Sequence, residues 1–160
     1  MGRYFRVTGI LLMVLSIIAI VIGIVFVYQG WSKNNLIVER MRVEKVTLAL
    51  DPANPSVTTE ITNGAEAQKA ADIIAGHRRS IAPTYQDLLG GGQFDPTNAK
   101  DLTYAQAMNL ENYLYLAVTA FGLINVVLGA GAFMIVTGIG MLLIGLVFIK
   151  MPVRLPQGLP

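Results

Sequence analysis

Two long stretches without a charged side chain constrain this sequence more than any other feature. The first lies between Arg6 and Lys33, and the second between Glu111 and Lys150. A helix rises about 1.5 Å per residue and the hydrocarbon core of a bilayer is about 30 Å thick, so about 20 apolar residues cross it. Both stretches meet this requirement, and the charged fraction of 14% is abnormally low for a soluble domain. The sequence therefore predicts an integral membrane protein with two spans.

The first span is predicted over residues 7–28, an unbroken run rich in Ile, Leu and Val. The run is longer than the apolar part of a signal peptide, about 7–15 residues, and no A-x-A-like cleavage site follows it. We therefore expect an uncleaved signal anchor that is preceded by a short tail, residues 1–6.

The second uncharged stretch is predicted to form one long helix. In helical form it would reach about 57 Å, too long for one perpendicular crossing but too short for two spans and a turn. We expect an apolar helix over residues 114–149, with the transmembrane part at about 128–149 and a tail at 150–160. The part before residue 128 is expected to project from the membrane and pack on other residues.

The orientation follows from Lys and Arg residues near the span ends. Arg3 and Arg6 precede the first span, and Lys150 and Arg154 lie in the tail that follows the second span, whereas all ten acids lie between the spans. Both tails are therefore expected in the cytoplasm and residues 29–113 outside the membrane as an extracytoplasmic cap. The aromatic anchors expected at the headgroups are Tyr28 and Trp31 on the outer side, and Tyr4, Phe5 and Phe148 on the inner side.

Small residues recur at seven-residue intervals in both spans. The first series is Gly9, Ser16, Gly23 and Gly30; the second is Gly131, Gly138 and Gly145, with Gly122 and Gly129 as a neighbouring pair. Seven residues are nearly two helical turns, so each series lies on one face, and small residues let helices approach closely in lipid. Antiparallel packing would align Gly9 with Gly145, Ser16 with Gly138 and Gly23 with Gly131. The alternative is that glycine is simply common in membrane helices.

The cap is expected to be small and α-rich, with a β-hairpin as an α+β variant. We expect a helical extension of the first span over residues 31–41, strands over 42–50 and 57–62 around a turn at 51–55, and a helix over 65–81 that Pro83 ends. A further turn at 84–89, a loop at 90–92 and a turn at 95–98 follow, and Asp101 or Thr103 is expected to cap the last helix. The predicted fold class is a mainly α membrane protein, a two-helix antiparallel transmembrane hairpin with helical extensions and this cap.

Several short motifs in the cap and the second helix form a recognisable pattern. They comprise His77, Thr84, Tyr85, Leu88, Asp95, Pro96, Met108, Asn109, Phe121 and Gly122. The pattern resembles a family of small two-span bacterial envelope proteins found mainly in actinobacteria and related lineages. The acidic Glu111 and the stretch from Tyr113 to Tyr115 depart from it, because relatives often place a basic residue there. The resemblance implies a bacterial inner membrane protein without an established activity, although many members are labelled "aromatic ring-opening dioxygenase".

The residue inventory does not suit that label. An extradiol dioxygenase holds iron with two His and one carboxylate, and this chain has one histidine and no cysteine. The same counts exclude two-His and Cys-based zinc sites within one copy. Asp72, His77 and Ser80 resemble a triad only in composition, since Ser80 is one helical turn from His77 and no nucleophile elbow surrounds it. We expect no enzyme activity and no intrinsic cofactor.

The remaining polar residues have ordinary structural explanations. His77 is expected to meet backbone carbonyls at a helix C-terminus or to pack on Tyr85, and Arg78 and Arg79 are expected to form a solvated helix end. The glycines at 90–92 lack the lysine of a phosphate loop. A net charge of +2 is too small to suggest nucleic acid, and spans without charges argue against a pump or channel.

The function expected from these features is that of a non-catalytic accessory or scaffolding subunit of a larger membrane complex, such as a photosynthetic or respiratory one. Its partners would be membrane lipids and other integral membrane subunits, with contact to lipid or pigment. The alternative is a free-standing envelope protein whose cap binds a small hydrophobic or lipid ligand.

Overall fold

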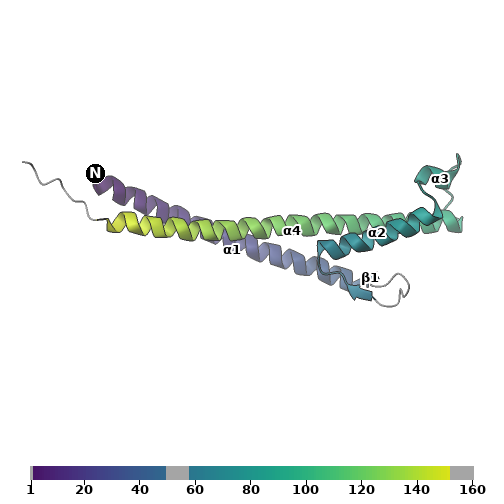
Figure 1. Ribbon diagram of the computed structural model, residues 1–160, viewed down its shortest axis with the longest axis horizontal. Helices are drawn as coiled ribbons and strands as arrows, with labels where there is room; N and C mark the ends of the chain where they lie inside the picture. Colours follow the sequence, from purple (N-terminus) through teal and green to yellow (C-terminus); the bar gives the residue numbers. More distant parts are fainter. Residues whose placement is uncertain (1, 50–57, 152–160) are drawn as a thin grey trace, which may run out of the picture. The chain divides into compact units, whose positions relative to one another are not determined.

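The computed structural model describes residues 2–49 and 58–151, with side chains from Tyr4 onward. The elements in Figure 1 are α1 (Gly2–Val43), β1 (Thr47–Ala49), β2 (Thr58–Glu60), α2 (Gly64–Ile81), α3 (Tyr85–Leu89) and α4 (Ala99–Lys150). The prediction of a mainly helical chain is confirmed. The turn predicted at 51–55, Leu50 and Val57 of the predicted strands, and Arg154 of the second tail lie outside the described residues.

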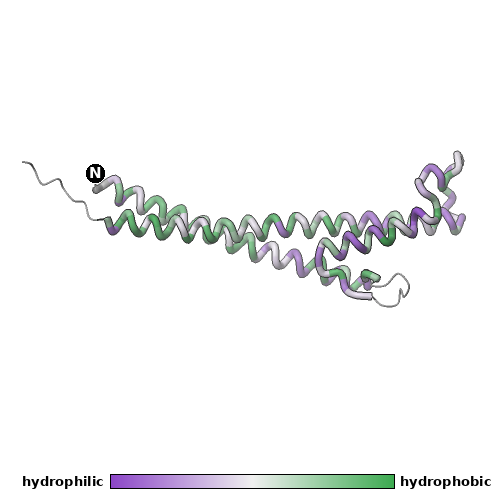
Figure 2. Tube along the Cα trace, viewed as in Figure 1, coloured by the Kyte–Doolittle hydropathy of each residue, from purple (hydrophilic) through white to green (hydrophobic). Residues whose placement is uncertain are grey.

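Two helices, α1 and α4, are long and apolar enough to cross a membrane by length and composition. Figure 2 shows the hydrophobic residues gathered in the N-terminal part of α1 and the C-terminal part of α4. Only 11% of the most apolar window of each helix is buried. Helix α1 begins at Gly2 and so includes residues predicted as a tail, and α4 begins at Ala99, well before residue 114, where the long apolar helix was predicted to begin.

The chain divides into two compact units. One consists of Met1–Ser32 with Asn125–Pro160, and the other of Lys33–Ile124. We call the first the helix pair and the second the cap. The cap in this sense contains the end of α1, the beginning of α4 and all elements between them.

Backbone-to-backbone contacts join the two segments of the helix pair. A Cβ atom built on Gly9 would lie 2.9 Å from the carbonyl oxygen of Gly145, and one built on Gly23 would lie 2.7 Å from that of Gly131. One built on Gly138 would lie 3.0 Å from the carbonyl oxygen of Ser16. Residues later in the first segment thus meet residues earlier in the second, so the two segments run antiparallel. These are the pairs that the seven-residue spacing predicts.

The cap has an alanine-rich core between α2 and α4. Ala67, Ala70 and Ala71 of α2 are buried in one cluster with Leu114 and Phe121 of α4, and Leu48 and Ile61 close it from the β-hairpin side. Methyl side chains let two helices approach closely, so the packing places large residues on α4 against small ones on α2. A smaller cluster of Ala82, Leu88 and Tyr104 lies near the start of α4.

The strand predicted over residues 42–50 was wrong in its first half. Helix α1 continues to Val43, and β1 covers only Thr47–Ala49, where Leu48 pairs with Thr59 of β2. The helix ends in a Schellman motif: the Val46 N–H donates to the Met41 carbonyl over 2.9 Å, and the Lys45 N–H donates to the Arg42 carbonyl over 3.1 Å. These bonds satisfy carbonyls that a strand beginning at 42 would leave without partners.

Lys45 occupies the left-handed position of this motif, with φ 53°. Glycine is usual there, because a Cβ atom in this conformation costs about 1–2 kcal/mol. We expect Lys45→Gly to raise the free energy of unfolding of the cap by about 1 kcal/mol, measured by thermal denaturation of the full chain in detergent. The neighbouring change Glu44→Gly serves as the control and is expected to give no stabilisation. A Lys45→Gly variant that is less stable than the wild type would contradict the claim that the backbone at Lys45 is strained.

Helix α2 begins with a network of side-chain caps. Asn63 accepts from the Glu66 N–H over 3.0 Å, and the Glu66 carboxylate accepts from the Thr62 N–H over 2.7 Å and from the Thr62 hydroxyl over 2.9 Å. These bonds to Thr62 lower the pKa of Glu66, and the bond from the Thr62 backbone N–H has the largest effect. A lowered pKa means that the bound carboxylate stabilises the helix above pH 4.5 and that this contribution is lost as the pH falls below it.

We therefore expect amide hydrogens at the start of α2 to exchange faster in Glu66→Gln than in the wild-type protein at pH 7. Below the pKa of Glu66, where the wild-type carboxyl is protonated, the two proteins are expected to exchange at the same rate. Asn63→Ala removes an uncharged cap and is expected to cost about 1 kcal/mol at both pH values. A Glu66→Gln effect of equal size at both pH values would exclude the charged cap.

Helix α4 begins at Ala99, and the prediction that Asp101 or Thr103 caps it was wrong. The Asn98 side chain accepts from the Lys100 N–H over 2.9 Å and takes the capping position. Asp101 accepts instead from the Asp95 N–H over 3.0 Å, and the Thr103 hydroxyl donates to the Ala99 carbonyl. The preceding Asp95 turn fixes the chain so that Asn98 is the last residue before the helix.

Candidate functional site

The cap has a groove on its surface. Its first part has a volume of about 670 Å³ and runs between the end of α1 and α4. The lining is mainly apolar and comprises Leu36, Ile37, Arg40, Met41, Glu44, Val46, Leu110 and Tyr113. We call this part the apolar end of the groove.

The second part has a volume of about 460 Å³ and shares Glu44, Val46 and Leu110 with the first, so the two parts adjoin. Its additional polar lining consists of Lys45, Thr47, Thr58 and His77, and its additional apolar lining consists of Ala49, Ala70, Ile73, Ile74 and Leu114. We call it the polar end. Both volumes fall within the range of about 300–1,000 Å³ that is usual for small-molecule sites.

The Schellman motif at the end of α1 positions the two ends of the groove. It turns the chain at Lys45, so that Met41 of the helix faces the apolar end and Thr47 of the strand lines the polar end. Lys45 itself projects from the strained position into the lining of the polar end. Strained residues of this kind cluster at binding sites.

Cations outnumber acids along the groove. Arg40 and Lys45 line it together with one acid, Glu44. Within residues 2–49 and 58–151 the ion pairs are Arg42 with Glu39 and Arg78 with Glu111, so neither groove cation has an acidic partner there.

A second polar arrangement lies inside the cap, between α2 and α4. The Arg78 Nε donates to Glu111 Oε2 over 2.7 Å, and its Nη1 donates to the Tyr104 hydroxyl. The Arg78 and Glu111 side chains are only 13% and 11% exposed, and the guanidinium carbon lies 5.1 Å from the centre of the Tyr104 ring. The hydrogen bond to Glu111 raises the pKa of Arg78. The arrangement is a satisfied ion pair that joins the two helices.

The expectation that Arg78 belongs to a solvated helix end was therefore wrong. Arg79 is exposed, but Arg78 points inward because α2 presents its alanine face to α4. Helical spacing could have revealed the partner: Tyr104, Glu111, Leu114 and Phe121 share one face of α4, and all four are buried. An acid on an otherwise apolar buried face requires a cation.

The triad-like residues are not assembled into a catalytic arrangement. The Ser80 hydroxyl donates to the His77 backbone carbonyl over 2.6 Å, and Asp72 accepts from Gln68 over 2.9 Å and from the Tyr115 hydroxyl over 3.2 Å. Partial desolvation and the bond to Asp72 raise the pKa of Tyr115. His77 is exposed at the polar end of the groove, and the Tyr85 ring instead lies 6.3 Å from the Tyr104 ring.

The motif residues mostly support the local fold. Thr84 forms a capping box with Asp87 at the start of α3, Leu88 is buried, and Met108 packs on the cluster around Tyr104. Asp95 accepts from the Thr97 N–H and hydroxyl in the turn that contains Pro96, and these bonds lower the pKa of Asp95. Phe121 is buried in the alanine-rich core, Asn109 is exposed, and a Cβ atom on Gly122 would meet nothing within 4 Å.

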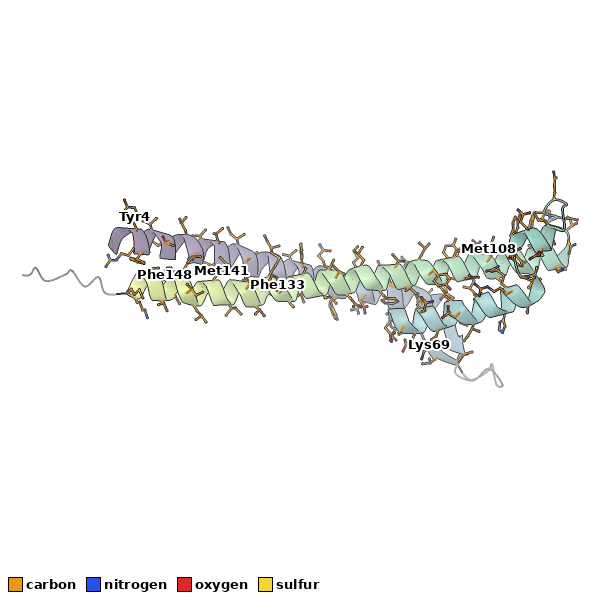
Figure 3. All side chains as sticks on the ribbon, turned by 45° about the horizontal axis from the view of Figure 1, so that its top comes forward. Tyr4, Lys69, Met108, Phe133, Met141 and Phe148 are labelled. Carbon is orange, nitrogen blue, oxygen red and sulfur yellow. The ribbon has the colours of Figure 1, made fainter. Side chains whose placement is uncertain are left out.

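The predicted aromatic anchors are mostly exposed. Tyr4, Tyr28 and Trp31 are 79%, 67% and 61% exposed, and Figure 3 shows Tyr4 and Phe148 near the same end of the helix pair. The rings of Phe5 and Phe148 meet edge to face, 6.0 Å apart. Among the packing residues, Ser16 is fully buried and its hydroxyl donates to the Met13 carbonyl, and Gly30 is buried. The role of the aromatic residues as headgroup anchors stays a prediction.

Among the residues that the structure describes, no group of three His, Cys, Asp or Glu side chains could hold a metal ion. In comparisons with models of protein families, with curated proteins and with solved structures, nothing matches this chain. The resemblance to two-span envelope proteins stays a prediction.

Proposed function

We propose that this protein is a two-span membrane protein that serves as a non-catalytic accessory subunit of a larger membrane complex. The observation that carries the proposal is an exposed face of α4 that the helix pair does not use. Gly129, Phe133, Val136 and Gly140 share this face at helical spacing. Phe133 and Val136 are each 70% exposed, and Cβ atoms on Gly129 and Gly140 would meet nothing within 4 Å.

Such a face suits another membrane helix. Lipid gives no hydrophobic drive for helices to associate, so they associate where small residues allow close approach and large ones fill the gaps. The glycines of the opposite face show what such an approach looks like, since Gly131, Gly138 and Gly145 already bring α4 against α1. The exposed face offers the same combination to a neighbouring subunit.

Purification in mild detergent tests this function. The tagged wild-type protein is expected to retain a constant set of larger membrane proteins, and Gly140→Leu is expected to lose them while its own helix pair stays intact. Gly122→Leu, whose Cβ also has open space but which lies in the cap, is the matched control. A wild-type protein that elutes only as a monomer or a homodimer would rule out the accessory role.

The proposed topology places both termini in the cytoplasm. The chain has no cysteine, so single cysteines report without background. Lys69→Cys, on the exposed surface of α2, is expected to react with an impermeant maleimide in intact cells, and Tyr4→Cys only after permeabilisation. The reverse pattern would invert the topology.

A second candidate function is favoured by the groove: the cap binds a small hydrophobic ligand. The apolar end has the volume of a ligand site, and its Leu110 and Tyr113 walls are 36% and 64% exposed. The two functions are compatible, because the groove lies on the cap and the exposed glycine face lies on the helix pair.

A further inference from the structure

We propose that the cap groove binds a long-chain carboxylic acid, with its hydrocarbon chain in the apolar end and its carboxylate in the polar end. This inference rests on the second proposed function and specifies its ligand. It depends on three features of the groove: its division into an apolar and a polar part, the sign of its charges, and the strained position of Lys45.

The division of the groove matches an amphiphile rather than a uniformly apolar partner. Leu36, Ile37 and Met41 line only the apolar end, whereas Thr47, Thr58 and His77 line only the polar end, beside apolar residues of α2 and α4 such as Ile73, Ile74 and Leu114. Leu110 and Val46 continue from one to the other. A single chain with one polar head follows this order, because apolar surface is removed from water along one part and polar groups meet donors along the other.

The charges favour an anionic head. Lys45 lines the polar end, and Arg40 lines the apolar end; neither has an acidic partner among the described residues. Glu44 lines both ends and is the one opposing charge, so Arg40 and Lys45 together leave the lining of the whole groove with one net positive charge. The hydroxyls of Thr47 and Thr58 and the imidazole of His77 add uncharged hydrogen-bonding groups, which a carboxylate accepts from readily.

The conformation of Lys45 points the same way. Its φ of 53° is one that glycine adopts without cost, yet a lysine is found there. Lys45 is one of the lining residues, so the strained position holds a cationic residue at the polar end that glycine would not supply. Strain that is retained at a concave site is consistent with a binding role.

The ligand can be tested by photocrosslinking the full chain in nanodiscs of phosphatidylcholine. The probe is a palmitic acid analogue with a diazirine near the end of its chain, and the comparison probe is the corresponding alcohol. Both enter the bilayer, so crosslinks to residues 7–28 report that probe is present and that the span lies in lipid. Crosslinks to cap peptides around Met41 and Leu110 report the groove.

We expect the acid to label the cap peptides and the alcohol to label them about fivefold less. Leu110→Glu, which puts a charge against the chain, is expected to reduce cap labelling by about tenfold, and Lys45→Gln by about two- to fivefold. Lys100→Gln, an exposed cap lysine outside the groove, is the matched control and is expected to change nothing. Hydrogen exchange of α2 is measured on each variant, so that loss of the cap fold is distinguished from loss of binding.

Equal cap labelling by acid and alcohol would overturn the anionic head. Span labelling without cap labelling by the wild-type protein would overturn the ligand site as a whole, while leaving the accessory function to its own co-purification test. Absence of span labelling would instead contradict the two-span proposal.

Discussion

Glu111→Leu is expected to destabilise the cap by about 3–5 kcal/mol, because it leaves the Arg78 guanidinium buried without its acid. The pair is nearly enclosed, at 13% and 11% exposure, and its Nε–Oε2 distance is 2.7 Å. Arg78→Met is expected to cost a similar amount for the reciprocal reason. Unfolding of the full chain by heat or urea in detergent, followed by circular dichroism, measures both effects.

The double variant Arg78→Met/Glu111→Leu separates the two parts of this cost. Replacing both charges by apolar side chains of similar size is often neutral, because the desolvation of the ions is removed together with their attraction. We therefore expect the double variant to recover most of the loss. Tyr104→Phe removes only one bond to Arg78 and is expected to cost about 1.5–3 kcal/mol. Single variants that each cost less than about 1 kcal/mol would show that the pair is solvated like a surface salt bridge.

Gly138→Leu is expected to separate the two segments of the helix pair. Even the first carbon of a new side chain would lie 2.6 Å from Ile20 Cγ1 and 3.0 Å from the Ser16 carbonyl oxygen. Overpacking costs about 1–3 kcal/mol where side chains can move aside, and here a backbone atom stands in the way. Gly140→Leu adds the same side chain two residues further on, where nothing lies within 4 Å, and is the matched control.

A crosslink across the pair measures the separation. Phe5→Cys and Phe148→Cys place two thiols where the aromatic rings meet, in a chain that has no other cysteine. A short bismaleimide is expected to join them in the otherwise unchanged background and with Gly140→Leu, but at least about tenfold more slowly with Gly138→Leu. Equal crosslinking in all three proteins would show that the glycine contacts do not hold the pair together.

Much of the helix pair was predictable because its determinants are local. The absence of charge between Arg6 and Lys33 requires only composition, and the pairing of Gly9 with Gly145 requires only two series of equal period. Helix α2 was likewise evident from its sequence, since Pro83 follows its end and Asn63 lies directly before it. The strand predicted over residues 42–50 was longer than β1 because the alternation of Val46 and Leu48 is visible in the sequence. The Schellman hydrogen bonds that keep residues 42 and 43 helical are not visible there.

The features of the cap depend on contacts between distant residues, and the sequence did not reveal them. Arg78 meets Glu111 across 33 positions, and nothing in the pair Arg78-Arg79 distinguishes the buried residue from the exposed one. The groove requires α1, the β-hairpin, α2 and α4 at once. The place of His77 on the groove lining depends on residues of β1, β2 and α4 that are distant from it in the chain.

The glycine contacts of the helix pair have a consequence for how this protein tolerates mutation. A Cβ atom at any of these glycines would lie within 3.0 Å of a carbonyl oxygen of the other segment, so the close approach depends on side chains being absent there. Saturation mutagenesis should consequently find the exposed positions of the helix pair permissive to almost any apolar residue. Positions 9, 23, 131, 138 and 145 should reject nearly all of them, irrespective of hydrophobicity.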